Sequence, residues 1–480
     1  MATTQDIVAK LWNLCNILRD DGVHYSHYVT ELTYLLFLKM LKETGQETLL
    51  PKNHRWDDVT GKSGIEQFNF YRALLVHLGN EGRGLVQEVF ANSSTHLRQP
   101  KDLAKLVSDI DALDWYDAKS DPDGLGQMYE GLLEKNAAEK KSGAGQYFTP
   151  RPLIQSIVGL VKPQAGELIQ DPAAGTGGFL IAAHEFIRKQ TDDLYELTEK
   201  QQNFQRKQAC IGLELVQETH RLLLMNAMLH GIESPLVLGD ALGDPGAKLP
   251  RADVILTNPP FGTKKGGGLP TRSDLTFPTS NKQLCFLQHI YRNLKPGGRA
   301  AVVLPDNVLF EDGVGVEVRR DLMNKCDLHT ILRLPTGIFY AQGVKTNVLF
   351  FRKGETKDTG NTKAVWVFDL RTNMPQFGKR TPLTPATFKD FEHAFGTDPN
   401  GGSKRKDQGE EGRFRKFTRE ALAERNDNLD IAWLRDENAT HTDDLPEPDV
   451  IATRITERLR TALAEMVKLN AALEVNGVAG

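Results

Sequence analysis

The sequence predicts an α/β protein built on a parallel, doubly wound β-sheet, with a helical region before it and another after it. Residues 1–140 carry apolar side chains at helical spacing, and from about residue 145 short apolar runs alternate with helical segments. Alternation of this kind is typical of a parallel sheet covered by helices. Because 480 residues exceed one typical domain, we expect two or three units.

The first 140 residues are expected to form a helical domain. Apolar residues recur every three or four positions, which places them on one face of a helix. Such faces usually form a core, so this region is predicted to be structural. Two of the faces consist of Ile7, Leu11, Leu14 and Leu18, and of Val29, Leu32, Leu36 and Met40.

The next region, residues 141–393, contains the predicted sheet. Short apolar runs bounded by turn residues have the length of buried strands. A further run at 364–370 is predicted to add an edge strand. The principal runs lie at residues 167–171, 210–215, 253–258, 300–305, 328–334 and 346–351.

Residues 394–480 are interpreted as a linker followed by a C-terminal helical region that docks onto a partner. The segment 394–416 is polar and rich in glycine and charge, which indicates a linker or flexible loop. The helical stripe beyond it either packs onto this chain's own core or docks onto another protein. The stripe consists of Ile455, Leu459, Leu463, Met466, Leu469 and Leu473.

The charge balance argues against a chain that grips nucleic acid strongly by itself. The formal net charge is −4, whereas phosphate binding needs concentrated lysine and arginine. The N-terminus shows no signal peptide and the longest apolar run, near 35–38, is far too short to span a bilayer, so a cytoplasmic protein is expected. Scattered cysteines without a CxxC pair, and a His24–His27 pair without an acidic partner, predict no metal site.

The sharpest chemical signal is Asn258-Pro259-Pro260-Phe261, directly after a predicted strand. Ligands of open α/β sheets bind beyond the carboxyl ends of strands. The Asn258 side-chain oxygen and the Pro259 carbonyl can each accept an N–H bond from an aromatic amine, which draws the amine toward tetrahedral geometry and concentrates its lone pair. Tandem prolines stiffen the loop, and Phe261 offers a flat face for stacking a base. Alone, such a turn is common and is more often a rigid structural element.

A glycine-rich turn, residues 171–179, follows a predicted strand and opens a helix. Glycine there permits a tight turn and close approach of a ligand, and the absence of a following GK[ST] excludes a phosphate loop. Glu214 and Asp240 end the next two segments, where they can accept hydrogen bonds from ribose hydroxyls and from an adenine amino group. Each acid alone reads as a solvated strand-end carboxylate, but the ordered set is hard to explain by chance.

A third signal precedes the glycine-rich turn at residues 145–152. The adjacent aromatics Tyr147 and Phe148 can wall a small-molecule pocket. Thr149 is predicted to cap the following helix, with Pro150 at its first position.

In this order, the segments GQYFTPRPLI, DPAAGTGGFL, IGLEL, LGDAL, NPPF, VLPDNVLF and LPTGIFYAQGVKTNVLFF closely resemble the modification subunit of type I restriction–modification systems, in particular its K-type branch. The resemblance covers nearly the whole chain. It implies a Rossmann-like methyltransferase domain behind a helical N-terminal domain, and N6 methylation of adenine in DNA with S-adenosylmethionine. A polar region near 400–416 that is shorter than expected for this branch leaves its DNA or partner contacts open.

The resemblance also implies roles for individual residues. Asn258, Pro259 and Phe261 would be catalytic, and Phe339 would join Phe261 in stacking the target base, which has to be flipped out of the duplex to reach the cofactor. The cofactor would be bound by Tyr147, Phe148, Thr149, Asp171, Ala173, Gly175, Thr176, Gly177, Glu214, Asp240 and Asn258.

Nothing after residue 351 looks like a second α/β domain that could read a DNA site. With the negative net charge, this indicates a separate specificity subunit. The family implies two copies of this chain on one specificity subunit, with a motor nuclease subunit joining to cleave double-stranded DNA. In the long loop 262–283, Lys264, Lys265 and Arg272 either touch the DNA backbone or are simply solvated.

Two alternatives stay open. A protein glutamine methyltransferase would use the same NPP chemistry, but such enzymes are usually shorter and carry tyrosine where this chain has Phe261. A cofactor-binding scaffold without catalysis would have no use for the Asn258 side chain.

Overall fold

The computed structural model describes residues 4–24, 27–113, 115, 124–139, 149–261, 270, 272–339, 344–378 and 381–435. Residues 1–434 form one compact unit and residues 435–480 a second. The predicted C-terminal helical stripe, the aromatic pair Tyr147 and Phe148, and the loop lysines Lys264 and Lys265 lie outside the described residues. In the described part of the chain, no helix is long and apolar enough to cross a membrane.

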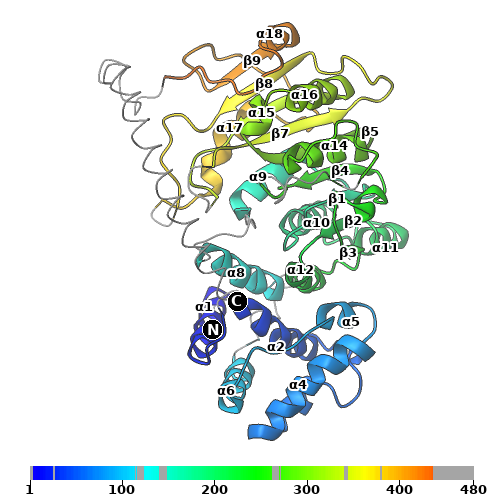
Figure 1. Ribbon diagram of the computed structural model, residues 1–480, viewed down its shortest axis with the longest axis vertical. Helices are drawn as coiled ribbons and strands as arrows, with labels where there is room; N and C mark the ends of the chain where they lie inside the picture. The colour runs from blue at the N-terminus through cyan, green and yellow to red at the C-terminus, as the bar shows by residue number, and fades with distance from the viewer. Residues whose placement is uncertain are drawn as a thin grey trace, which may run out of the picture. The chain divides into compact units, whose positions relative to one another are not determined.

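A nine-stranded sheet forms the centre of the first unit (Figure 1). Its strands are β1 (Ile169–Asp171), β2 (Cys210–Glu214), β3 (Leu236–Leu238), β4 (Ala252–Thr257), β5 (Leu294–Pro305), β6 (Cys326–Arg333), β7 (Thr346–Lys353), β8 (Ala364–Asp369) and β9 (Phe414–Thr418). Their spatial order is β3-β2-β1-β4-β5-β7-β6-β8-β9. The first five strands are mutually parallel, whereas β7 runs antiparallel between β5 and β6, and β9 runs antiparallel to β8.

Helices surround this sheet and precede it in the chain. Before the sheet lie α1 (Thr4–Asp20), α2 (Tyr28–Glu43), η2 (Glu47–Leu49), α3 (Trp56–Thr60), α4 (Gly64–Glu81), α5 (Leu85–Phe90), α6 (Pro100–Asp111) and α8 (Gly124–Glu139). With the sheet come α9 (Arg151–Val161), α10 (Gly178–Gln190), α11 (Glu199–Lys207), α12 (Gln217–Leu229), α13 (Asp244–Ala247), α14 (Lys282–Asn293), α15 (Asn307–Phe310), α16 (Val314–Lys325), η3 (Pro385–Phe388), α17 (Lys389–Phe395) and α18 (Arg419–Glu424).

Successive side chains of the central strands pack into two separate hydrophobic cores, one on each face of the sheet. Val254 and Leu256 of β4 pack into the core that holds α9, α10 and the N-terminal helices, whereas Ile255 packs into the core that holds α14 and α16. Successive residues of a strand point to opposite faces, so an uninterrupted apolar run indicates a strand covered on both sides. The predicted α/β fold with a helical N-terminal region is thereby confirmed. The prediction of a parallel sheet is wrong for β7 and β9, which run antiparallel to their neighbours.

Three details of the prediction are corrected by the structure. The run at 364–370 is not an edge strand, because β9 pairs with β8 on its outer side. β9 begins inside the segment interpreted as a linker, where the adjacent charges Arg415 and Lys416 separate two phenylalanines and break the alternation expected of a half-buried strand. The short edge strand β3 was not anticipated, since three residues are too few to show a period.

Candidate active site

The site lies at β1, where the chain, after adding β2 and β3 on one side of this strand, continues with β4 on its other side. β1 pairs in parallel with β2 on one side and with β4 on the other, so the loops after β1 and β4 leave the same edge side by side. This is the switch point at which open α/β sheets bind ligands. The glycine-rich turn follows β1, and Asn258 follows β4.

The glycine-rich turn requires glycine at particular positions. Gly175 and Gly177 have φ angles of 55° and 89°, which disfavour any side chain. A Cβ on Gly177 would also lie 2.7 Å from Cδ1 of Leu223 on α12. The Asn226 amide on the same helix donates to the Thr176 carbonyl at 2.9 Å, so α12 holds the turn in place.

Glu214 connects the turn to the loop that carries Asp240. Its carboxylate accepts the backbone N–H groups of Gly175 at 3.0 Å and of Val216 at 2.8 Å. Its carbonyl accepts the N–H of Gly239 at 2.8 Å, directly before Asp240. Burial raises the pKa of Glu214, against the lowering effect of these amide bonds. One residue therefore ties together three of the predicted cofactor-binding segments.

Asp171 is a buried carboxylate at the floor of the same site. It is 2% exposed and accepts the N–H of Ala173 at 3.0 Å. Burial raises the pKa of Asp171 to about 7; the Thr257 side chain and Ala173 N–H oppose this rise, and the charge of Glu214 adds to it. Among the described residues no lysine or arginine forms an ion pair with Asp171 or Glu214.

Asp240 differs from these two acids because its side chain is exposed. One carboxylate oxygen accepts the N–H of Leu242 at 2.8 Å, which shapes the loop after β3. The backbone link through Gly239 places this loop beside Glu214, as the order of the motifs predicted.

Thr149 does not cap the following helix, so that prediction is wrong. The helix α9 begins at Arg151, with Pro150 as its N-cap and no side-chain cap. The Thr149 hydroxyl instead accepts a hydrogen bond from the Asn258 amide nitrogen at 2.9 Å. Because Pro150 supplies the carbonyl that accepts the first helical N–H groups, the Thr149 side chain is available for this long-range bond.

The predicted base-stacking rings lie against each other. Phe261 and Phe339 meet edge to face, with ring centroids 6.0 Å apart and an interplanar angle of 77°. Phe339 is 2% exposed, whereas Phe261 is only partly buried. Edge-to-face contact is a favoured geometry of aromatic pairs, so Phe339 braces the ring that follows the two prolines.

Arg272 does not present its charge at the surface, as a DNA-backbone contact would require. Its side chain is only 4% exposed and pairs with Asp274. Its guanidinium also donates to the Ala241 carbonyl at 3.0 Å and lies 2.6 Å from Nδ1 of His289. Burial and the neighbouring arginine lower the pKa of His289 to about 3, so the neutral ring accepts this bond. Arg272 fastens the loop after Asp240.

Sequence reasoning missed three residues of this region. Asn226 supports the glycine-rich turn, Arg151 follows Thr149-Pro150 in a partly buried ion-pair cluster, and Leu215 beside Glu214 is 62% exposed. A single arginine in the otherwise apolar run of α9 was the one available signal. An exposed leucine after a strand has no signature in the sequence.

Comparison with known proteins identifies the family. Residues 120–443 match the N-6 DNA methylase family and residues 7–49 match the HsdM N-terminal domain. The chain is 55% identical to the type I restriction enzyme StySPI methylase subunit of Salmonella potsdam, over 96% of this chain and 94% of that protein. It is 54% identical to the EcoKI methylase subunit of Escherichia coli K12, with the same coverage.

The crystal structure of the EcoKI M protein is also similar, with a TM-score of 0.61 and 50% identity over 96% of this chain and 94% of that chain. The predicted family, enzyme class and cofactor are thereby confirmed. The chain belongs to the methylase subunits of type I restriction enzymes, which are adenine-specific DNA methyltransferases that use S-adenosylmethionine.

Proposed function

We propose that this methyltransferase binds its cofactor across the carboxyl ends of β1, β2 and β3 and receives the target adenine beside Asn258. The observation that carries the proposal is the pairing of β1 with β4, which brings the Asp171 turn and the Asn258 loop to one edge. Methyl donor and acceptor have to lie next to each other for in-line transfer, and neighbouring loops satisfy this requirement.

The carboxylates fit the polar groups of S-adenosylmethionine. Glu214 would accept the ribose hydroxyls, and Asp240 would accept the adenine amino group. Asp171 would favour the positive charge of the cofactor, because no basic side chain among the described residues neutralises it. The exposed side chain of Leu215 would pack on the adenine ring.

The glycine-rich turn would supply close backbone contacts to the same cofactor. Ala173, Gly175, Thr176 and Gly177 bring their main chain to the carboxyl edge of the sheet. Tyr147 and Phe148 are proposed to wall the pocket. The cofactor supplies the electrophilic methyl group, and this chain supplies orientation and exclusion of water.

Asn258 and Pro259 would hold the amino nitrogen of a flipped adenine. The Asn258 side-chain oxygen and the Pro259 carbonyl each accept one N–H, which concentrates the nitrogen lone pair toward the methyl group. Phe261, braced by Phe339, would stack on the base. The surplus proton leaves to water after the transfer.

The chain is proposed to act in the cytoplasm as part of a larger assembly on double-stranded DNA. Two copies would bind one specificity subunit, and a motor nuclease subunit would join for cleavage. The net charge of −4 supports this division, because the affinity for DNA phosphates then comes largely from partners.

Replacement of Asn258 by alanine tests the function directly. The variant and the wild type are co-expressed with the specificity subunit, and transfer of labelled methyl groups to unmodified DNA is measured. Loss of one preorganised hydrogen-bonding group at the reacting atom typically lowers the rate by about 100- to 1000-fold. Folding and DNA binding are expected to be retained, and the cofactor Kd is measured separately because Asn258 is also a proposed cofactor contact.

Asn293→Ala is the matched control, since Asn293 lies near the opposite edge of the sheet and bonds Gln170 and the Pro250 carbonyl. Near-wild-type methylation by Asn258→Ala would overturn the proposed chemistry. Labelling of a protein glutamine instead of DNA, or no labelling despite cofactor binding, would favour the glutamine-methyltransferase or scaffold alternative.

A further inference from the structure

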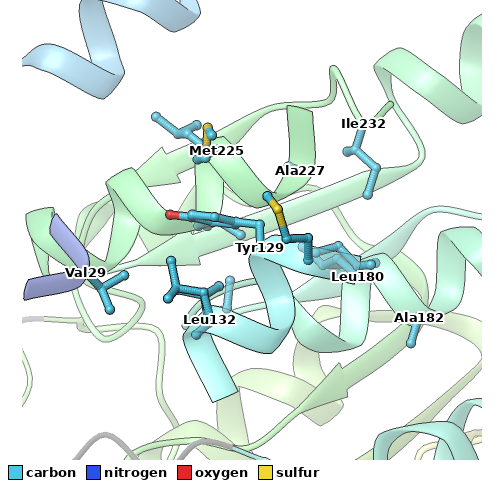
Figure 2. Close-up of a cluster of buried hydrophobic side chains, with 14 of the residues drawn as sticks. Val29, Tyr129, Leu132, Leu180, Ala182, Met225, Ala227 and Ile232 are labelled. Atoms are coloured by element: carbon cyan, nitrogen blue, oxygen red, sulfur yellow. The ribbon is translucent and has the colours of Figure 1, made fainter. Parts of the chain in front are cut away.

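Helix α8 is packed between the N-terminal helices and the helices of the sheet (Figure 2). Tyr129 and Leu132 of α8 are fully buried, in one cluster with Val29 of α2, Leu180 of α10 and Met225 of α12. The Tyr129 hydroxyl also lies 2.8 Å from the hydroxyl of Thr33. Close-packed interiors do not deform continuously, so α8 moves only together with its neighbours or by repacking.

A partly buried charge cluster joins α8 to the start of α9. Arg151, the first residue of α9, forms ion pairs with Glu130 of α8 and, at 2.9 Å, with Glu185 of α10. His230, whose side chain is fully buried, lies 3.4 Å from the other oxygen of Glu185. Although these two acids and the histidine are close enough to hold a metal ion, the guanidinium of Arg151 already serves as their cation.

The cluster is energetically demanding. Burial raises the pKa of Glu130 to about 7, while Arg151 lowers it and Glu185 and Glu134 raise it. Removing one member of this partly desolvated cluster leaves a charge with less compensation, so the ion pairs of Arg151 link the three helices α8, α9 and α10.

The segment Thr149–Arg151, which leads into α9, also contacts the Asn258 side chain. Thr149 stands two residues before Arg151, and prolines at 150 and 152 restrict the backbone between and after them. The Thr149 hydroxyl accepts from the Asn258 amide nitrogen. This bond selects one of the two orientations of the amide and leaves its oxygen as the group that meets the substrate amine.

We propose that Arg151 is a positioning residue for methyl transfer: it anchors the Thr149–Arg151 segment to α8 and α10, and through Thr149 it fixes the orientation of Asn258. The helical N-terminal region thereby sets the geometry of the reacting group. This inference rests on the proposed role of Asn258, and it assigns Thr149 to the amide of Asn258 in addition to any contact with the cofactor.

The test uses four variants in the full chain with its specificity subunit. Arg151→Met keeps the apolar stem but removes the charge, Thr149→Val removes the hydroxyl, and the third variant combines both changes. Thr149→Ser restores the hydroxyl. Arg188→Met is the matched control, because Arg188 of α10 also pairs with an acid, Asp193, which belongs to neither α8 nor α9. Single-turnover methylation at saturating cofactor and the cofactor Kd are measured for each.

Arg151→Met and Thr149→Val are each expected to slow the methyl-transfer step by about 10- to 100-fold, the range for a displaced reacting group, without a matching rise of the cofactor Kd. The double variant should be no slower than the slower single variant, because both changes break one relay. Thr149→Ser should recover most of the rate that Thr149→Val loses, and the control Arg188→Met should retain the wild-type rate.

Independent effects that multiply in the double variant would overturn the proposal, and so would a Thr149→Val variant that changes only the cofactor Kd. If Arg151→Met does not fold, Glu130→Gln replaces it, since it weakens the same ion pair and leaves the guanidinium with Glu185. A wild-type complex without adenine methylation would instead contradict the proposed function itself.

Discussion

The buried carboxylates at the two sides of the sheet balance their charge in different ways. Asp171 and Glu214, at the ends of β1 and β2, are held by backbone amides, and burial raises the pKa of each. Asp369, at the end of β8, is fully buried but pairs with Arg333 at 2.7 Å. Burial would raise the pKa of Asp369, yet the Thr372 N–H and the Arg333 charge outweigh it, and the pKa lies below its usual value.

This difference separates a binding site from a structural pair. An acid that already has its cation inside the fold gains little from a cationic ligand. A buried carboxylate that has no cation inside the fold can gain one when a cationic ligand binds. Carboxylates with pKa values perturbed in this way are typical of functional sites. The comparison therefore supports, independently of the sequence motifs, the proposal that Asp171 and Glu214 face the cofactor.

The largest effect is expected on stability at the β8 side. Arg333→Met leaves Asp369 charged and buried, which typically costs about 3–5 kcal/mol of unfolding free energy. Urea denaturation measures this loss. Arg352→Met, which removes a more exposed pair with Glu355, is the control and should cost less than about 1 kcal/mol. Equal losses of unfolding free energy in the two variants would contradict the structural role assigned to the Arg333–Asp369 pair.

A smaller effect is expected on cofactor affinity at the β2 side. Glu214→Gln keeps the shape of the side chain but removes the charge that would accept the ribose hydroxyls. Hydrogen bonds to charged groups contribute about 1.5–3 kcal/mol, which corresponds to a cofactor Kd about 10- to 100-fold higher. Calorimetric titration measures this change. Glu218→Gln, an exposed acid at the start of α12, should leave the Kd unchanged; an equal loss there would show a nonspecific charge effect.

The smallest effect is a pH dependence set by Asp171. Its pKa of about 7 lies above the usual value for aspartate, so the protonated form favours the cofactor-free fold. The stability that protonated Asp171 contributes to the cofactor-free fold is fully present below about pH 4 and is lost as the pH rises through about 7. A cationic cofactor prefers the ionised form, so its binding should weaken by about fivefold between pH 7 and pH 6.

The Kd at the two pH values checks this prediction, with Asp171→Asn as the variant that should lose the dependence. In this range the cofactor's own amino group stays largely protonated, because α-amino groups titrate near pH 8. A pH profile that is the same in Asp171→Asn would assign the effect to another group.

The sequence predicted most of the fold because the central strands are apolar on both faces. Ile255 and its neighbours form an uninterrupted run that only a doubly covered strand explains. β9 escaped prediction because Arg415 and Lys416 break up its apolar residues, and the pairing with β8 that stabilises it is a tertiary contact.

The candidate site was predictable where local motifs carry it and unpredictable where distant residues complete it. Glu214 and Asp171 follow strands in the expected order, so their proximity could be inferred from topology. Thr149 and Asn258 are 109 positions apart, and nothing local distinguishes a helix cap from a partner of a distant amide. Arg272 was misjudged for a related reason, since a charged loop residue gives no sign that Asp274 and Ala241 enclose it.

The final strand has a consequence for assembly of the chain during synthesis. β8 pairs with β6 on one side, and until residues 414–418 arrive its other side is an unpaired ladder of Ala-Val-Trp-Val-Phe-Asp. Exposed apolar edges of this kind recruit strands from other molecules. β9 replaces that edge with one that carries Arg415 and Lys416, charges that discourage further pairing. Because β9 covers the apolar edge of β8, chains that lack residues 414–418 should self-associate more readily than complete ones.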